Sequence, residues 1–302
     1  MNSDRGDGME FLTHTQKKTY DRDGYLLLER RLSAEQLATL HDEIDRYTAK
    51  ARGLTEGTDE LDLEDSHQPE APRVRRIKLP HTHSAVFRDM MLSDTILAPA
   101  RDLIGPDLRL HTTKLNMKEA GYGAAVEWHQ DFAFYPHTND AVLAIGVILD
   151  DMGPENGPLM VFPGSHRGAI HDHHADGYFV GAMDLARDGY DMKDAVPLMG
   201  PAGSISIHHG RIVHGSALNT SSKSRRILFY EMMAADAWPI MGSMTKFTDL
   251  ADYDSRLLCG QPRQPRLADV PVRVPLPAPP IGKTIYEIQK GLHARSFETA
   301  KG

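Results

Sequence analysis

Trp128-His129-Gln130-Asp131 is the stretch of sequence that predicts a β fold around a metal site. On an extended strand, residues i and i+2 point to the same side, so His129 and Asp131 can both reach one ion while Gln130 faces away. His214, in Val213-His214-Gly215-Ser216, can add a second imidazole from a distant strand. A His-x-Asp pair alone is a weak signal, because a chain with 16 histidines contains such pairs by chance.

The residues after His214 strengthen the prediction of a metal site. Arg225 opens the apolar run 227–230, and its guanidinium could form a bidentate pair with a carboxylate beside the metal. The hydroxyl of Ser216 could donate a hydrogen bond to the same carboxylate. Two neutral imidazoles and one carboxylate on one face of an ion, with the other positions open, are typical of non-haem Fe(II) oxygenases.

Several motifs, taken in order along the chain, resemble those of the phytanoyl-CoA dioxygenase family. They are His129-Gln130-Asp131, Glu155-Asn156-Gly157-Pro158-Leu159, Pro163-Gly164-Ser165-His166, and His214-Gly215-Ser216 followed by Asn219 and Arg225. The similarity extends from about residue 20 to about residue 235. This family comprises Fe(II)- and 2-oxoglutarate-dependent hydroxylases and includes ectoine hydroxylase.

The resemblance implies a mostly β fold with flanking helices, in which a double-stranded β-helix (jelly roll, cupin-like) carries N-terminal helical additions. It implies a dioxygenase that uses Fe(II), 2-oxoglutarate and O2 to hydroxylate an unactivated C–H bond of a small molecule, with release of succinate and CO2. No catalytic residue beyond the metal ligands is implied. The ligands would be His129, Asp131 and His214. Arg225 and Ser216 would bind the distal carboxylate of 2-oxoglutarate, and Lys78, Thr113 and Gln130 match positions that line the pocket in relatives.

The identity of the substrate stays open in the sequence. Gly146 stands where the phytanoyl enzyme has a Trp, and Thr112-Thr113 replace a Gln or Met. A fatty acyl-CoA would need a basic surface, which the cluster from Arg73 to Lys78 permits, although such a run is more often a solvated face. A third alternative is a jelly-roll protein that binds metal without turnover. It fits less well, because structural zinc sites usually have four protein ligands.

Composition favours a single domain that acts on small molecules. The chain has 302 residues, 40% hydrophobic and 25% charged, which suffices to bury one core. The formal charge is 34 minus 42, or −8, which argues against nucleic acid as a partner. Cys259 is the only cysteine, and neither a signal peptide nor a membrane-spanning apolar run is evident. We therefore expect a cytoplasmic enzyme without a membrane partner, as a monomer or homodimer.

The predicted domain, residues 1–302, has three parts. Residues 13–105 form a helical scaffold, with capping boxes that begin at Thr13 and Ser33 and with a further helix at 93–103. Residues 106–240 form the jelly-roll core. Strands are expected at 108–117, 141–149, 159–162, 203–207 and 225–233, and a turn at 208–210. Residues 241–302 form a Pro-rich arm that covers a sheet edge or contacts another subunit, with a short helix near 285–291.

Residues 165–199 are too long for a tight connection and predict a lid-like insertion. The residues considered as possible substrate contacts are Phe132, Arg167, Tyr178 and Phe179. The run His171-Asp172-His173-His174 resembles a second metal site, but nothing downstream supplies a matched ligand set. His209 could lie beside the metal ligands or be a buried pocket histidine.

Overall fold

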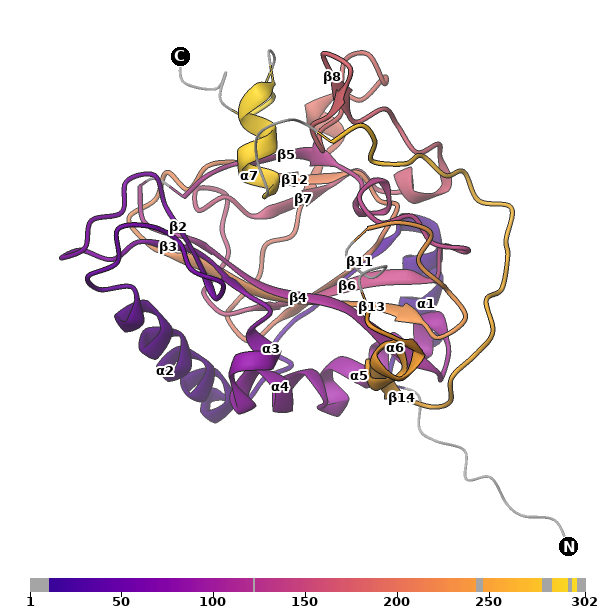
Figure 1. The fold of residues 1–302 in the computed structure, drawn as a ribbon, viewed down its shortest axis with the longest axis horizontal. Helices are drawn as coiled ribbons and strands as arrows, with labels where there is room; N and C mark the ends of the chain where they lie inside the picture. Colours follow the sequence, from indigo (N-terminus) through magenta and orange to yellow (C-terminus); the bar gives the residue numbers. More distant parts are fainter. Residues whose placement is uncertain (1–10, 122, 243–246, 279–283, 293–294, 298–302) are drawn as a thin grey trace, which may run out of the picture.

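Two antiparallel sheets face each other, as Figure 1 shows. The computed structural model describes residues 11–121, 123–242, 247–278, 284–292 and 295–297. The larger sheet has the order β1-β11-β6-β13-β4-β3-β2, with β14 paired to β4, and the smaller sheet has the order β10-β7-β12-β5. This is the arrangement of a double-stranded β-helix, so the predicted fold class is confirmed.

The strands of the two sheets are β1 (Tyr25–Leu28), β2 (Leu61–Leu63), β3 (Val74–Lys78), β4 (Leu108–Lys118), β5 (Val126–His129), β6 (Val142–Ile148), β7 (Leu159–Val161), β10 (Val196–Pro197), β11 (Ile205–His209), β12 (His214–Ser216), β13 (Arg225–Ala234) and β14 (Leu257–Cys259). A separate hairpin pairs β8 (His174–Ala175) with β9 (Tyr178–Phe179).

Side chains of the larger sheet alternate between a helix-covered face and a face that looks into the fold. In β13, Leu228 and Tyr230 belong to the main core, whereas Phe229 lies in a separate cluster on the opposite face. The same alternation in β4 turns Lys114 and Lys118 inward, where both line one cavity. As the apolar run predicts, every residue of β6 is buried.

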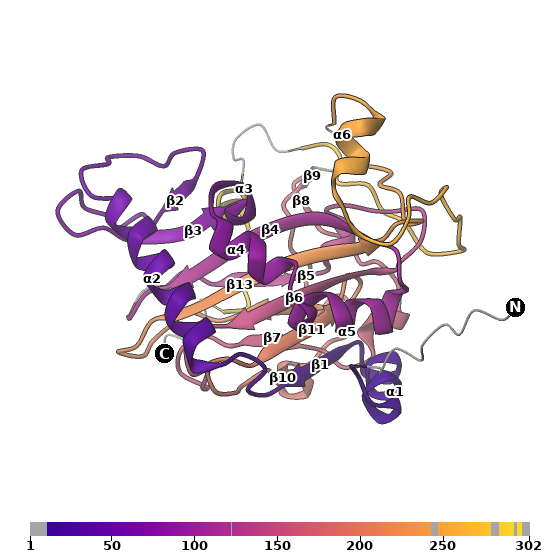
Figure 2. The ribbon, with the colours of Figure 1, turned by 90° about the horizontal axis from the view of Figure 1, so that it is seen from below.

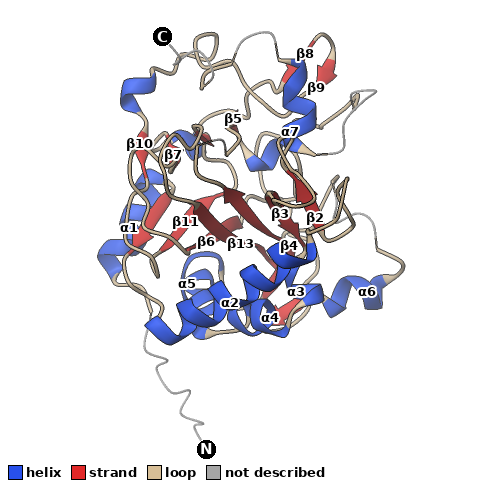
Figure 3. Ribbon diagram, turned by 90° about the vertical axis from the view of Figure 1, so that its left-hand side faces the viewer, coloured by secondary structure: helices blue, strands red, loops and turns tan. Residues whose placement is uncertain are grey.

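Helices α2, α4 and α5 cover the outer face of the larger sheet (Figures 2 and 3). The helices are α1 (His14–Asp23), α2 (Ala34–Lys50), α3 (Pro80–His83), α4 (Ala85–Met91), α5 (Asp94–Ile104), α6 (Leu250–Ser255) and α7 (Ile285–Ile288), with 3-10 turns η1 (Asp131–Ala133), η2 (Ser165–Arg167), η3 (Met192–Asp194) and η5 (Gln289–Gly291). The capping boxes at Thr13 and Ser33 are present as predicted. Leu40, Ile44 and Tyr47 of α2 are buried against the sheet.

Two details differ from the sequence prediction. The sequence predicts a turn at 208–210, but β11 continues through His208 and His209 because both pair with residues of β6. After Trp238 the sequence shows little periodicity, yet α6 and β14 form there, and β14 adds a short edge to β4. Within the described ranges, no helix combines the length and the apolar character that crossing a bilayer requires.

Candidate active site

The two predicted ligand histidines are neighbours across a pair of strands. β12 pairs with β5 so that His214 lies opposite His129. Gln130 keeps extended backbone angles, φ −119° and ψ 125°, before η1 begins at Asp131. Asp131 therefore points to the same side as His129, and its Oδ1 lies 3.6 Å from His129 Nε2 and 3.8 Å from His214 Nε2. The structure brings all three predicted ligands together, with ligand atoms within 4.8 Å of one another.

Backbone hydrogen bonds fix which nitrogen of each histidine faces Asp131. His129 Nδ1 lies 2.8 Å from the carbonyl oxygen of Glu127, and His214 Nδ1 lies 3.0 Å from that of Ile212. An Nδ1–H that donates to a carbonyl leaves Nε2 with a free lone pair, as metal ligation requires. Burial lowers the pKa of His214 well below its usual value, so the imidazole is neutral. Two neutral imidazoles and one carboxylate fit a ferrous ion.

Arg225 and Lys118 lie opposite each other on β13 and β4 and are both fully buried. The guanidinium of Arg225 donates to the carbonyl oxygen of Gly157, with Nε at 3.0 Å. Nζ of Lys118 donates to Ser216 Oγ at 2.8 Å, to the Ser216 carbonyl at 3.2 Å, and to the Ala217 carbonyl. Arg225, Ser216 and Lys118 therefore converge on one end of the cavity that the metal triad also lines.

These two cations have no carboxylate within ion-pair distance among the residues that the structure describes. Burial lowers the pKa of Arg225 to about 10. Burial also lowers the pKa of Lys118 well below its usual value, and the charge of Arg225 lowers it further. Like charges directly opposite on neighbouring strands are destabilising. The pair is therefore suited to receive an anion.

The site comprises an inner and an outer cavity. The inner cavity, of about 50 Å³, has the metal triad, Lys118, Ser216 and Arg225 in its wall. The outer cavity, of about 470 Å³, shares His129 and Asp131 with it and is lined mainly by polar and charged side chains. Those polar residues are Asp59, Arg76, Lys78, His111, Thr112, Thr113, Lys114, Glu231 and Thr284.

Lys78 and Thr113 border the outer cavity and not the Arg225 end of the inner one. Nζ of Lys78 pairs with Asp62 Oδ1 at 3.1 Å. Thr113 Oγ1 lies 2.7 Å from His81 Nδ1. Both residues are thus placed to face a substrate more readily than the distal end of 2-oxoglutarate.

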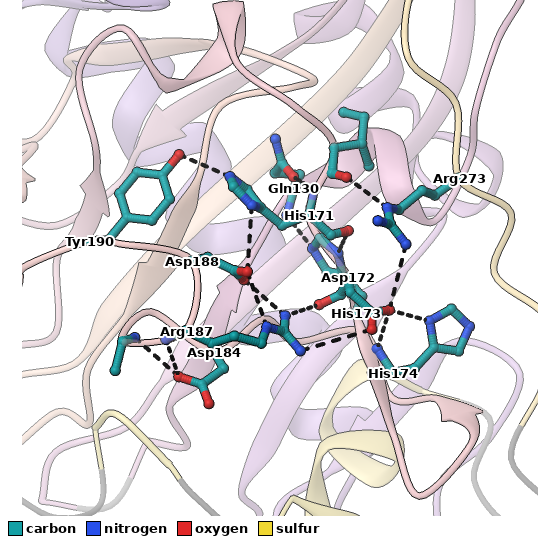
Figure 4. Close-up of polar contacts among 12 residues, drawn as sticks. Gln130, His171, Asp172, His173, His174, Asp184, Arg187, Asp188, Tyr190 and Arg273 are labelled. Atoms are coloured by element: carbon teal, nitrogen blue, oxygen red, sulfur yellow. Dashed lines mark hydrogen bonds and ion pairs between the residues drawn. The ribbon is translucent and has the colours of Figure 1, made fainter.

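Gln130 lines neither cavity, as the strand alternation predicts, and Figure 4 shows it among the residues of the insertion. Its side-chain nitrogen donates to the Arg211 carbonyl at 2.7 Å, and its side-chain oxygen accepts from the backbone N–H of His171 at 2.8 Å. The backbone N–H of Gln130 donates to His173 Nε2 at 2.9 Å, while His173 Nδ1 bonds the His171 carbonyl at 2.9 Å. We therefore do not carry Gln130 into the proposed cosubstrate site. It ties the two ligand-bearing segments to the insertion instead.

The histidine run of the insertion bonds to the protein itself. Figure 4 shows His171 next to Tyr190, with Nε2 and the hydroxyl 3.1 Å apart, and His174 paired with Asp172 at 2.7 Å. Among the described residues, the only cluster with metal-ligand geometry is the triad. His209 faces the rings of Tyr20 and His166, away from the metal ligands.

The four residues considered as substrate contacts line neither cavity. Phe132 is completely buried in a core cluster. Arg167 donates to the Asp21 carbonyl beside α1, Tyr178 is exposed, and Phe179 packs edge-on against Phe134. Arg167, Tyr178 and Phe179 were expected on a lid, but no residue of the 165–199 segment lines either cavity.

Several pocket residues escaped sequence reasoning. Nε2 of His208 lies 3.4 Å from Asp131 Oδ2, and the half-buried Lys114 forms an ion pair of 2.6 Å with the buried Glu231. Phe134, not Phe132, lines the outer cavity. The alternation of polar residues in β4 contained a signal for Lys118, because it predicts that Lys118 shares a face with Lys114.

The comparisons with known proteins agree with this geometry. A family model described as phytanoyl-CoA dioxygenase (PhyH) matches residues 20–227. A protein from Stutzerimonas stutzeri named probable alpha-ketoglutarate-dependent hypophosphite dioxygenase is 34% identical over 287 residues, which cover 93% of this chain and 99% of that protein.

Solved structures of EctD from S. alaskensis share the fold. The structure with bound Fe has a TM-score of 0.64 at 25% identity, covering 87% of this chain and 88% of that chain. The structure with 2-oxoglutarate and 5-hydroxyectoine has a TM-score of 0.62 at 26% identity, with the same coverage.

The enzyme class expected from the sequence is therefore confirmed, and the non-catalytic alternative is wrong. The protein is a 2-oxoglutarate-dependent non-haem iron dioxygenase whose cofactors are Fe(II), 2-oxoglutarate and O2. With its triad in place and a family match over most of its length, the chain belongs to the phytanoyl-CoA dioxygenase family.

Proposed function

We propose that His129, Asp131 and His214 bind the ferrous ion and that Arg225, Ser216 and Lys118 bind the distal carboxylate of 2-oxoglutarate. Arg225 and Lys118 are buried and have no carboxylate partner among the described residues, which supports the second assignment. Burial and the charge of Arg225 lower the pKa of Lys118, and a carboxylate between the two side chains would favour the protonated lysine and accept charge-assisted hydrogen bonds from both. Lys118 thus joins the two residues that the family resemblance implied.

When bound, Fe(II) supplies the activation of O2 that couples oxidation of 2-oxoglutarate to oxidation of the substrate. The chain's own residues place the partners and keep water out. Ile227 and Phe229 form apolar walls of the inner cavity beside the triad. Nε2 of His208 lies 3.4 Å from the second oxygen of Asp131 and would help to orient that carboxylate when the ion is bound.

We propose that the substrate is a small, polar molecule that occupies the outer cavity. The observation that carries this proposal is the lining of that cavity, in which Arg76, Lys78 and Lys114 lie among the carboxylates of Asp59, Asp131 and Glu231. A long acyl chain would bury its methylene groups against these charged side chains, which is unfavourable. The charged lining therefore favours a compact polar molecule over an acyl-CoA.

Hypophosphite is the first candidate, because a relative that aligns over nearly the whole chain carries that substrate in its name. In the balanced reaction, one oxygen atom of O2 enters a P–H bond of hypophosphite to give phosphite. The other enters succinate, as 2-oxoglutarate loses CO2. The reaction needs no further oxidant or reductant.

The test is to incubate the iron-loaded enzyme with 2-oxoglutarate and hypophosphite and to follow phosphite by phosphorus NMR and succinate by chromatography. We expect equimolar phosphite and succinate. Arg76→Met should raise the KM for hypophosphite about tenfold, as expected for loss of one charged contact in a partly exposed site, with the KM for 2-oxoglutarate unchanged. Lys193→Met, at an exposed lysine outside both cavities, is the matched control.

Succinate formation that hypophosphite does not stimulate would contradict the substrate proposal while leaving the enzyme class intact. If proline, ectoine or an acyl-CoA stimulates succinate formation and hypophosphite does not, the stimulating compound is the better candidate for the substrate.

A further inference from the structure

Residues 284–292 and 295–297, near the C-terminus, dock on the strand that carries the metal ligand His129. The side-chain oxygen of Gln289 accepts the backbone N–H of Glu127 at 3.0 Å, and its nitrogen donates to the Gly181 carbonyl at 2.8 Å. The backbone N–H of Ser296 donates to Glu127 Oε2 at 2.9 Å. Figure 1 shows α7 lying above β5 and β12. The sequence predicts a short helix here, but not its place over the site.

Phe297 anchors the same segment against both ligand strands. Its ring stacks on Trp128, which precedes His129, at a centroid distance of 5.3 Å and an interplanar angle of 24°. A Cβ atom at Gly215, next to His214, would lie 3.0 Å from the Phe297 ring. The absence of a side chain at residue 215 therefore lets the segment approach the metal strands closely.

Two residues of α7 form part of the cavity walls. Ile285 lines both the inner and the outer cavity, and Tyr286 lines the inner one. The ring of Tyr286 is 7% exposed and lies under the guanidinium groups of Arg75 and Arg76, at 5.0 and 5.1 Å from its centroid. Arg76 itself lines both cavities, so Tyr286 also supports a cation of the proposed substrate pocket.

The family model ends at residue 227, so this wall lies outside the matched region. The proposed metal and cosubstrate residues all lie within the matched region, 20–227. We infer that Ile285 is a specificity-determining residue that closes the substrate pocket against larger molecules, and that Tyr286, which lines the inner cavity, holds Arg76 toward the substrate. This inference rests on the proposed function for the identity of the substrate. The closure of the pocket by Ile285 does not depend on which substrate is bound.

The experiment compares the full chain with Ile285→Ala, Tyr286→Ala and Tyr286→Phe, using P–H acids of increasing size as probes: hypophosphite, methylphosphinate and phenylphosphinate. Ile285→Ala and Tyr286→Ala should raise the kcat/KM ratio of phenylphosphinate to hypophosphite about tenfold, since removing a wall group of this size changes discrimination by that order. Tyr286→Phe keeps the ring and should keep the size preference of the unchanged enzyme. Leu267→Ala, at a highly exposed aliphatic residue of the same C-terminal region, is the control.

A second readout is independent of the substrate. Without any substrate, opening the wall should increase the slow conversion of 2-oxoglutarate to succinate about threefold, because water then reaches the site more easily. In Ile285→Ala the KM for 2-oxoglutarate should change less than about twofold, because Arg225, Ser216 and Lys118 are untouched. If hypophosphite is not a substrate, this readout still tests the wall. The inference is overturned if folded Ile285→Ala and Tyr286→Ala keep the size preference of the unchanged enzyme. If no probe is turned over, it is overturned if both variants keep the unchanged substrate-free rate of succinate formation.

Discussion

The pairing of Lys118 with Arg225 leads to a quantitative prediction about 2-oxoglutarate binding. Lys118→Met keeps the length and apolar stem of the side chain and removes its charge. Loss of one buried charge-assisted contact typically costs 2 to 5 kcal/mol, and we expect about 2 kcal/mol, the low end, because Arg225 remains. A cost of about 2 kcal/mol corresponds to roughly 30-fold weaker binding.

The measurement is calorimetric titration of 2-oxoglutarate into the Mn(II)-loaded protein under nitrogen. A matched ligand isolates the distal carboxylate: 2-oxopentanoate has the same chain length and the same keto acid end but no distal charge. Its affinity should be nearly equal in the unchanged protein and in Lys118→Met. Lys193→Met, which removes an exposed lysine paired with Asp191, should bind 2-oxoglutarate normally.

The reasoning is refuted if Lys118→Met, correctly folded, binds 2-oxoglutarate within about threefold of the unchanged protein. It is also refuted if the affinities for both keto acids fall in parallel. In the second case, Lys118 would act on the keto acid end or on the metal, and not on the distal carboxylate.

Three further predictions follow from the site. Asp131→Ala should abolish succinate formation and iron binding, and near-normal turnover would remove Asp131 from the ligand set. His173→Phe leaves the Gln130 N–H without its acceptor, so it should lower the free energy of unfolding by about 1 to 3 kcal/mol and weaken iron affinity in chelator competition. His174→Phe, a change on the outer side of the same loop, should leave iron affinity as it is. Burial lowers the pKa of His137 to about 4. Between pH 6.5 and about 4, His137 is therefore protonated in the unfolded chain but unprotonated in the folded chain. The contribution of neutral His137 to the free energy of unfolding is therefore fully present above pH 6.5. It falls by about 1.4 kcal/mol per pH unit as the pH decreases toward 4. Urea denaturation at several pH values should show a shallower acid dependence in His137→Phe, and equal slopes would contradict the assignment.

The residues that the sequence identified correctly are those whose spacing carries chemistry. His129 and Asp131 are two residues apart on extended backbone, and this spacing alone fixes their common direction. Lys118 has no such local signature, because its importance comes from the register that places it opposite Arg225. His208 was assigned to a turn, since nothing in His208-His209-Gly210 reveals that β11 continues along β6.

The assignment of the lid failed for a related reason. Length and lack of periodicity indicate that residues 165–199 form an irregular insertion, but they do not indicate which face it covers. Backbone contacts through Gln130 and His173 hold part of that insertion behind the metal strand. The outer cavity is bordered instead by the short helix α7, near the C-terminus. The Pro-rich sequence that precedes α7 gives little indication of such a role.

The direct pairing of His214 with His129 has a consequence for how such enzymes can diversify. Because the distance between the two imidazoles is set by strand register, the chain between them can gain or lose whole loops without altering the coordination sphere. Insertions after η1, where Phe134 and Tyr135 line the outer cavity, would reshape the rim of that cavity while His129, Asp131 and His214 keep their places. One catalytic centre can therefore be retained while the surrounding walls are rebuilt for new molecules.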